Sequence, residues 1–401
     1  MHVIADDLIF HLQQRGGISR IYREIWPRML DLDPSLTLEI ATSPGAVDLP
    51  PHPRLTVTPA LPPILDSSLK PYKLTWPLRA EITGLRRRRP PSAQGDGATP
   101  SAARAGTIWH STYYSAPRFW PGPKVIMAHD LVHERFPELF DARWGAMVRA
   151  QKRRAARAAD LVICISRSTQ RDVIGFWGVP VERTAVVHLA ASPTFSSESS
   201  SYADGDARPR PSIDPAVFAK AGAVQLPQPF ALFLGARPAY KNFDRVLEAL
   251  AREQRVAELH LVAVGPEWSD RERGLVSQLR LASRVIQLPW ADDDTLVDLY
   301  RKAAAFIYPA LYEGFGIPLV EAMACGCPIV ASDIPSSREV AGDVALYFPP
   351  REVGALGNAL ATALAERRPS DRTRAGMARA AEFSWERTAA GVLDAYRGLV
   401  P

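Results

Sequence analysis

Short apolar segments alternate with helical ones along the chain, and this alternation restricts the fold more than any other feature. The apolar segments are typical of buried strands because they are short and bounded by glycine, proline or polar residues. In chain order they are residues 36–41, 107–110, 124–128, 161–165, 230–234, 259–264, 285–288, 304–308 and 328–331. Helical spacing marks segments between them, including 142–159, 243–252 and 271–282. Strands that alternate with helices favour parallel sheets covered on both faces, so the sequence predicts an α/β fold.

A polar stretch divides this pattern into two similar halves. Residues 191–228 are rich in serine, proline and charged residues, and we interpret them as a linker or surface insertion. We therefore expect Rossmann-like domains at 1–190 and 229–382. Residues 90–106 offer almost nothing apolar to bury and are expected to form a mobile loop. Two such halves facing each other form a cleft, with ligands outside the carboxyl ends of the strands.

Composition and charge exclude several classes of protein. The 48 lysines and arginines exceed the 43 acids by five over 401 residues, which is too little to indicate nucleic-acid binding. No apolar run approaches the ~20 residues that a membrane span needs, and the N-terminus lacks the lysines of a signal peptide. The three cysteines form no disulfide framework, and no Cys/His spacing matches a zinc site. We predict a cytoplasmic protein.

Basic residues gather in two places, residues 69–89 and 149–157. Aromatic and aliphatic residues are interspersed with the first group, and the second group lies on a predicted helix. Each group is explained either by contact with an anionic lipid surface or by ordinary solvation. The first explanation would place the protein peripherally on the inner face of the cell membrane.

The strongest local signal is the segment 308–323, where a strand, a glycine-containing loop and a helix follow one another. Pro318 suits the first turn of a helix, so the helix through 319–324 directs unpaired N–H groups and its positive dipole end at the loop. This is an arrangement that binds diphosphates. Glu321 can accept hydrogen bonds from ribose hydroxyls, and Glu313 can bind another polyol. The alternative is that Glu313 caps a turn and Glu321 is a solvated helical residue.

A second loop in the same half offers positive charge. Arg237 and Lys241 follow a predicted strand and precede a helix, and a diphosphate requires such cations. A basic pair in a loop is usually just solvated. Its place at a strand end in the half that holds Glu313 and Glu321 favours a binding role.

These segments resemble the GT-B glycosyltransferases of family 4, which are retaining nucleotide-sugar enzymes. EGFGIPLVEAM followed by GCPIVAS resembles the family signature, and GGISR, MAHDLVHERFPELF, ADLVICISRSTQRDV, GARPAYKNF, ADDDTLVDLYRKA and FSWERTAAGVLDAYRGL also fit. The resemblance covers nearly the whole chain. GGISR and YKNF resemble the mannosyltransferase B-like subgroup, which builds bacterial polysaccharides. The resemblance also implies that a C-terminal helix within 383–401 crosses back to the N-terminal domain.

The resemblance implies a role for each matching residue. Glu321 would bind the ribose and Glu313 the transferred sugar, while Arg237 and Lys241 would hold the diphosphate and stabilise it as it leaves. Backbone groups near the donor would come from Gly17, Gly314, Phe315, Gly316, Leu319 and Val320. One departure is Tyr240, where some relatives carry a basic residue, and this makes the assignment of Arg237 the weaker one.

Three further segments need a functional and a structural interpretation. His129 lies at a strand end and would face the donor sugar, although a lone histidine there is often structural. The segment from Leu288 to Trp290 is expected to form the wall for the nucleotide base. Asp292, Asp293 and Asp294 precede a helix, so capping explains them better than metal binding. We expect neither a catalytic metal nor another cofactor.

The predicted function is retaining transfer of a hexose, with mannose and a GDP-sugar donor favoured, to a saccharide or lipid-linked saccharide. Same-face attack is favoured over a covalent intermediate, because the first half offers no distinguished carboxylate nucleophile. Two alternatives stay open: a non-catalytic nucleotide-sugar-binding partner subunit and a GT-B nucleotide-sugar epimerase.

Overall fold

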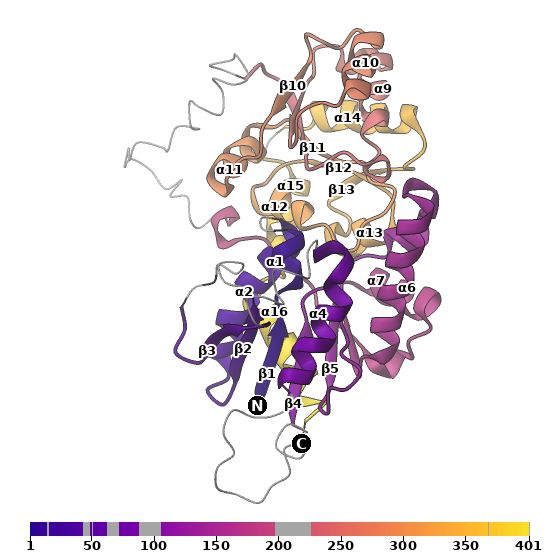
Figure 1. Cartoon of the computed structure of the whole chain (residues 1–401). Coiled ribbons are helices and arrows are strands. Elements are labelled where there is room, and N and C mark those ends of the chain that lie inside the picture. Colours follow the sequence, from indigo (N-terminus) through magenta and orange to yellow (C-terminus); the bar gives the residue numbers. More distant parts are fainter. Residues whose placement is uncertain are drawn as a thin grey trace, which may run out of the picture. The chain divides into compact units, whose positions relative to one another are not determined.

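The computed structural model describes residues 1–13, 16–42, 49, 51–61, 72–87, 106–196, 226–367 and 369–400. The chain forms two compact units (Figure 1). Unit 1 comprises Met1–Leu189 and Trp385–Pro401, and unit 2 comprises Ala190–Ser384. Nearly all of the expected mobile loop at 90–106 and most of the expected linker at 191–228 lie outside the described residues.

Unit 1 contains a parallel seven-stranded sheet with the order β3-β2-β1-β4-β5-β6-β7. The strands are β1 His2–Asp6, β2 Thr37–Thr42, β3 Leu55–Pro59, β4 Thr107–Ser111, β5 Lys124–Ala128, β6 Leu161–Cys164 and β7 Thr184–Val186. The order reverses between β1 and β4, so their carboxyl ends border the crevice in which sheets of this type bind ligands. Asp6, Ser111 and Ala128 are the last residues of β1, β4 and β5.

The helices of unit 1 include one that comes from the far end of the chain. They are α1 Leu8–Leu12, α2 Gly17–Leu32, α4 Tyr72–Arg87, α5 Val132–Arg135, α6 Ala142–Ala158, α7 Arg167–Asp172 and α16 Trp385–Arg397. Helix α16 packs against α2, and the Glu386 carboxylate pairs with Arg28 at 2.7 Å. The Tyr396 hydroxyl lies 2.6 Å from Nδ1 of His110 on β4. The predicted return of the last helix to the N-terminal domain is therefore confirmed.

Unit 2 contains a parallel six-stranded sheet with the order β10-β9-β8-β11-β12-β13. Its strands are β8 Phe230–Leu234, β9 His260–Val264, β10 Val285–Leu288, β11 Ala305–Tyr308, β12 Ile329–Ser332 and β13 Ala345–Phe348. Its helices are α9 Phe243–Arg252, α10 Asp270–Gln278, α11 Asp293–Lys302, α12 Ile317–Ala324, α13 Pro335–Ala341, α14 Val353–Ala365 and α15 Asp371–Ala380. The predicted α/β class and the two parallel sheets are confirmed.

Apolar spacing explains how the helices of unit 2 attach to the sheet. Phe243, Val246, Leu247 and Leu250 of α9 recur at helical spacing and are buried in the core with the strands. Helix α10 ends at Gln278, four residues before the predicted end at 282, because Arg280 adopts the left-handed conformation with φ 57°. Within the described part of the chain, no helix is long and apolar enough to cross a bilayer.

Candidate active site

In unit 2, the loops after β8 and β11 bring Lys241 and Glu313 together across 72 residues of sequence. The Lys241 ammonium pairs directly with the Glu313 carboxylate, and the two side chains are 25% and 15% exposed. The backbone N–H of Leu311 donates to the Tyr240 carbonyl at 2.8 Å, which joins the two loops. A cation and a carboxylate thus lie side by side at the carboxyl edge of the sheet, where ligands bind.

Tyr308, the last residue of β11, supports the same carboxylate. Its hydroxyl is hydrogen-bonded to Glu313, and burial together with the charge of Glu313 raises the pKa of Tyr308 well above its usual value. The phenol therefore stays protonated at neutral pH and acts as a donor. The Glu313 carboxylate is thus held by Lys241 on one side and Tyr308 on the other, and it is still partly exposed.

Helix α12 begins immediately after this loop. Gly316 precedes it with φ 113°, and a Cβ there would lie 3.1 Å from both Leu319 Cδ1 and Tyr308 Oη. Only glycine adopts this conformation without strain. The Leu319 N–H already donates a hydrogen bond to the Gly316 carbonyl at 2.9 Å within the first turn. In the expected contact with a phosphate, the same N–H would serve both acceptors. The expected phosphate contact of Val320 stays a prediction.

Glu321 lies one turn into α12 and is 4% exposed. Its Oε2 accepts a hydrogen bond from the Tyr300 hydroxyl of α11 at 3.1 Å. Burial and the charge of Glu321 raise the pKa of Tyr300 well above its usual value, so the tyrosine remains the donor. The alternative that Glu321 is a solvated helical residue is therefore wrong. Tyr300 was not anticipated, because no local pattern connects it with Glu321.

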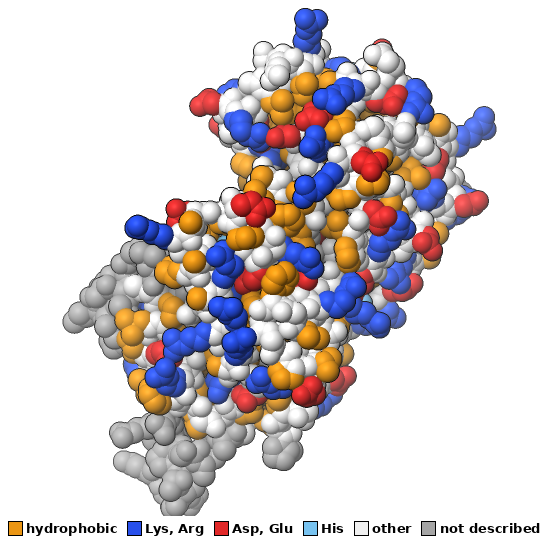
Figure 2. Space-filling view, turned by 90° about the vertical axis from the view of Figure 1, so that its right-hand side faces the viewer, with side chains coloured by type: hydrophobic (Ala, Val, Ile, Leu, Met, Phe, Trp, Pro, Cys, Tyr) orange, Lys and Arg blue, Asp and Glu red, His pale blue; other side chains and the backbone are white. Residues whose placement is uncertain are grey.

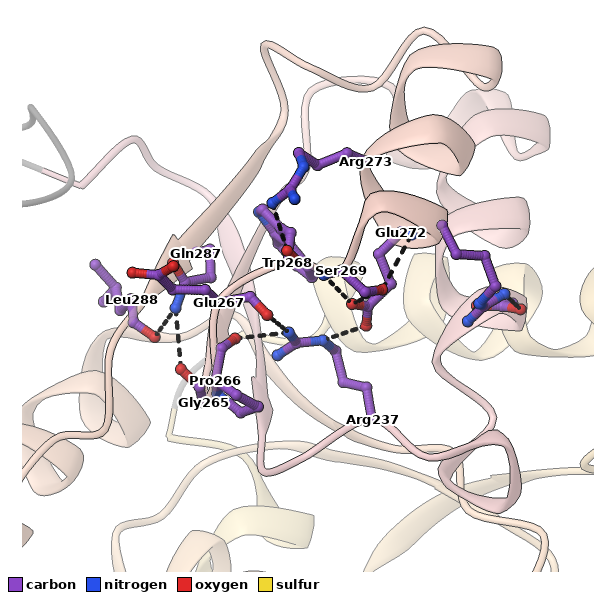
Figure 3. Close-up of polar contacts among 12 residues, drawn as sticks. Arg237, Gly265, Pro266, Glu267, Trp268, Ser269, Glu272, Arg273, Gln287 and Leu288 are labelled. Carbon is purple, nitrogen blue, oxygen red and sulfur yellow. Dashed lines mark hydrogen bonds and ion pairs between the residues drawn. The ribbon is translucent and has the colours of Figure 1, made fainter. Parts of the chain in front are cut away.

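Arg237 does not lie with Lys241 in an open cationic pair. Its side chain is 2% exposed, and its Nε lies 2.6 Å from Glu272 Oε1 (Figure 3). Its Nη2 donates to the carbonyls of Pro266 and Glu267 at 2.6 and 3.0 Å. The guanidinium also covers the Trp268 ring at 4.4 Å. Arg237 therefore holds the loop between β9 and α10.

Arg237 is therefore already engaged within the protein, although its Nη1 has no hydrogen-bond partner among the described residues, and its contact with the diphosphate stays a prediction. Its charge is already matched by Glu272, and a hollow of about 430 Å³ beside the loop is also lined by the ion pair Arg271–Asp244 at 2.6 Å. With Glu267, the lining of this hollow carries three acidic side chains against two arginines. Among the residues that the structure describes, Lys241 is the better candidate for the diphosphate.

The expected wall for the nucleotide base lies at the carboxyl end of β10. Leu288 is fully buried, and its carbonyl accepts hydrogen bonds from the Gly265 N–H at 2.9 Å and from Gln287 Nε2 at 2.8 Å. Trp290, two residues farther on, is 61% exposed. Leu288 is thus fixed at the buried end of β10, whereas Trp290 presents an exposed aromatic ring.

In unit 1, His129 follows β5 at the carboxyl edge of the sheet and is 4% exposed. Neither ring nitrogen has a hydrogen-bond partner among the described residues. Burial lowers the pKa of His129 to about 3, with Lys152 adding to the shift and Asp130 opposing it. The imidazole is therefore neutral at neutral pH and has a donor and an acceptor to offer. An alternative role as a structural histidine with all its hydrogen bonds made does not fit these unpartnered nitrogens.

Gly17 begins α2, as the glycine turn predicted. A Cβ at this position would meet nothing within 4 Å in the described structure. The chain itself therefore does not require glycine there, and close approach of a donor phosphate stays a prediction. The expected donor contacts of Gly314 and Phe315 also stay predictions. The Phe315 ring packs against Phe383 with 5.7 Å between centroids.

Each of the two basic groups contains a buried cation, while Arg86, Arg153, Arg154 and Arg157 are exposed. In 69–89, Arg79 is buried and Arg87 pairs with Glu39 at 2.9 Å, while Lys70, Arg88 and Arg89 lie outside the described residues. In 149–157, Lys152 is buried. Figure 2 shows lysine and arginine side chains spread over one face among acidic and hydrophobic ones. Contact with an anionic membrane stays a prediction.

The aspartate run before α11 has the predicted structural role. Asp292 Oδ1 accepts a hydrogen bond from the Thr295 N–H at 2.9 Å and caps the helix. Within the described ranges, no group of three or more His, Cys, Asp or Glu side chains could hold a metal ion.

Comparison with known proteins adds to this geometry. The family model for glycosyl transferases group 1 matches residues 218–382, and that for glycosyltransferase family 4 matches residues 102–194. The O-antigen chain mannosyltransferase B of Escherichia coli is 27% identical over 300 residues, which cover 73% of this chain and 70% of that protein. The serotype-specific mannosyltransferase WbdA of Escherichia coli is 28% identical over 291 residues, 70% of this chain but 34% of that protein.

Solved structures share the fold. Sucrose-phosphate synthase from Thermosynechococcus elongatus superimposes with a TM-score of 0.70 and 19% identity over 100% of this chain and 99% of that one. Anabaena HepE in complex with UDP-glucose gives a TM-score of 0.65 and 17% identity over 100% of both chains. The chain thus has the two parallel-sheet units of the GT-B fold, with a glycosyl transferases group 1 domain at residues 218–382 and a glycosyltransferase family 4 domain at residues 102–194.

Proposed function

We propose that the protein is a retaining hexosyltransferase that moves a sugar from a nucleoside diphosphate to a saccharide or lipid-linked saccharide. The observation that carries the proposal is the junction of Lys241, Glu313 and the start of α12, with Glu321 one turn farther on. A cation, a helix N-terminus and two anchored carboxylates match the chemistry of a diphosphate with a sugar on each side.

In this proposal, unit 2 binds the donor. Glu321, fixed by Tyr300, accepts hydrogen bonds from the ribose hydroxyls. Lys241 binds the diphosphate, and Glu313 accepts hydrogen bonds from the hydroxyls of the transferred sugar. Trp290 offers a surface on which the base can stack. Arg237 acts indirectly, because it holds the loop between β9 and α10.

The reaction breaks the bond between the anomeric carbon and the β-phosphate oxygen, and the acceptor oxygen forms a bond to the same face of that carbon. The acceptor's proton passes to the departing phosphate oxygen. Lys241 and the N-terminus of α12 stabilise the charge that develops on the phosphate, and such stabilisation is worth most where water is excluded. Unit 1 contributes His129, whose neutral imidazole hydrogen-bonds the transferred sugar. No metal ion is required, because the lysine and the helix supply the positive charge.

The relatives support a hexose donor without deciding its base. The O-antigen relative is named as a mannosyltransferase, which favours GDP-mannose. The HepE structure holds UDP-glucose, so a uridine donor must be compared directly. Thermal-shift measurements with GDP-mannose, GDP, UDP-glucose and UDP would rank the donors. We expect the largest rise in melting temperature with the guanosine ligands.

The site assignment is tested with Lys241→Ala, Glu313→Ala and Glu321→Ala. Loss of a charge-stabilising donor such as Lys241 should lower kcat by about 100-fold. Lys302→Ala is the matched control, since this lysine is 47% exposed on α11 and pairs with Asp298 at 3.4 Å. Near-normal transfer by all three site variants would refute the assignment. Nuclear magnetic resonance of the product checks that the anomeric configuration is retained.

Two other functions give different results in the same assays. A non-catalytic binding subunit would be stabilised by nucleotide sugars but would release no nucleoside diphosphate, with or without acceptor. An epimerase would convert the donor into an isomeric sugar without any acceptor, which product analysis detects. The partly exposed pair of Lys241 and Glu313 favours transfer, because a cation for the leaving diphosphate lies beside a carboxylate for the transferred sugar.

A further inference from the structure

His129 has a fixed position without any hydrogen bond from the described protein to its ring. The imidazole meets the rings of Tyr22 and Tyr114 edge-on, with centroids 6.4 Å apart in each case and interplanar angles of 86° and 84°. These contacts limit the tilt of the ring but leave both nitrogens available. The position of the ring therefore depends on what holds its backbone.

The hydroxyl of Tyr114 holds that backbone on both sides. It accepts a hydrogen bond from the His129 N–H at 3.1 Å and donates one to the Asp130 carbonyl at 3.4 Å. Tyr114 is 1% exposed and has φ 49°, a left-handed conformation that strains a non-glycine residue. Its surroundings must therefore hold the tyrosine in place.

Lys152 of α6 contacts both Tyr114 and Asp130. It is 1% exposed, and its Nζ lies 3.6 Å from Asp130 Oδ1 and 4.8 Å from the centre of the Tyr114 ring. The same Asp130 oxygen accepts the Val132 N–H at 3.2 Å. A buried ammonium costs several kcal/mol of desolvation, which an apolar side chain of equal length would avoid. The positive charge of Lys152 is therefore better explained by its contacts with Asp130 and Tyr114 than by packing.

We propose that Tyr114 and Lys152 are positioning residues that fix His129 for glycosyl transfer. The proposal rests on the function proposed above, in which His129 contacts the transferred sugar. Tyr114 fixes the backbone on both sides of the histidine, and Lys152 fixes Tyr114 and Asp130 together. Neither residue needs to touch the substrate.

The test compares Lys152→Met with Arg153→Met, the next residue on α6, which is exposed. Misplacing a reacting group by about 1 Å costs ~100-fold in rate, so Lys152→Met should lower kcat by about 10- to 100-fold. The KM for the donor should change less than about threefold, because the donor's nucleotide is bound by other residues. Arg153→Met should change neither. Tyr114→Phe, which removes a single oxygen, should lower kcat in the same way and tests the proposal if Lys152→Met fails to fold.

A double-mutant cycle with His129→Ala separates positioning from general damage. If Lys152 and Tyr114 act through His129, adding either substitution to His129→Ala should lower kcat by less than about twofold further. Equal losses with and without His129 would overturn the proposal, and so would a normal kcat for His129→Ala alone. Failure of the proposed function itself looks different: the wild-type protein would then transfer no hexose from any nucleotide sugar tested.

Discussion

Acid should destabilise unit 1 through two histidines that the fold keeps neutral. Burial lowers the pKa of both His110 and His129 to about 3, from the ordinary 6.5. Below pH 6.5 these two histidines bind protons in the unfolded chain but stay neutral in the folded one. The free energy of unfolding is therefore at its full value above pH 6.5 and falls as the pH drops toward 3. Between pH 7 and pH 5 each histidine should remove roughly 2 kcal/mol from the free energy of unfolding.

The measurement is urea unfolding at pH 7 and pH 5, followed by tryptophan fluorescence. Of the nine tryptophans, only Trp268 and Trp290 belong to unit 2, so the signal reports mainly on unit 1. His110→Asn is the decisive variant, because it removes the titrating ring. A loss of roughly 2 kcal/mol corresponds to a midpoint lower by about 1 M urea. The pH-dependent loss of the variant should be smaller than that of the wild type by about this amount.

The comparison of pH-dependent losses makes the test independent of other effects. Carboxylates titrate equally in both proteins, and the cost of breaking the contact of His110 with Tyr396 is present at both pH values. The reasoning is refuted if the wild type and His110→Asn lose the same free energy between pH 7 and pH 5. That result would mean that His110 accepts a proton in the folded state.

Three further predictions concern unit 2. Gly316→Ala should lower the free energy of unfolding by about 1–3 kcal/mol, since φ 113° and the contact with Leu319 strain any side chain; calorimetry checks this. Arg237→Met should cost about 3 kcal/mol by leaving the buried Glu272 carboxylate unpaired, and Glu272→Gln added to it should recover part of the loss. An unchanged melting temperature in Arg237→Met would contradict this. Prolonged dialysis against EDTA should leave the transfer rate unchanged, whereas a loss restored by a divalent cation would refute metal independence.

The sequence predicted much of the sheet architecture, because buried parallel strands are continuous apolar runs. The predicted strand at 230–234 and helix at 243–252 match β8 and α9 at both ends. The end of α10 was missed, because the left-handed turn at Arg280 lies between two leucines in a segment without glycine or proline. Strands β1, β3, β7 and β13 were not singled out, and β3 carries exposed side chains on an edge of its sheet.

The sequence predicted which candidate residues lie close together where a strand end and a motif coincide, and did not predict partners that come from separate elements. Lys241 and Glu313 were expected in one site because both follow strands of the same sheet. The partnership of Tyr300 with Glu321 depends on how α11 packs against α12, which no local pattern records. Lys152 is different, because a signal was present in the sequence. It shares helical spacing with Val148 and Ala155, both buried, so the basic run concealed an inward-facing lysine.

The return of α16 to unit 1 has a consequence for how the protein forms during synthesis. Unit 1 is discontinuous in sequence, since the segment Ala190–Ser384 intervenes before Trp385. A ribosome therefore delivers the whole of unit 2 before unit 1 can bury the side chains of Trp385, Leu393 and Tyr396. Unit 2 can form its core first, while residues 1–189 of unit 1 are still without α16. A nascent chain interrupted before α16 would leave the apolar face of α2 uncovered and open to chaperones and proteases.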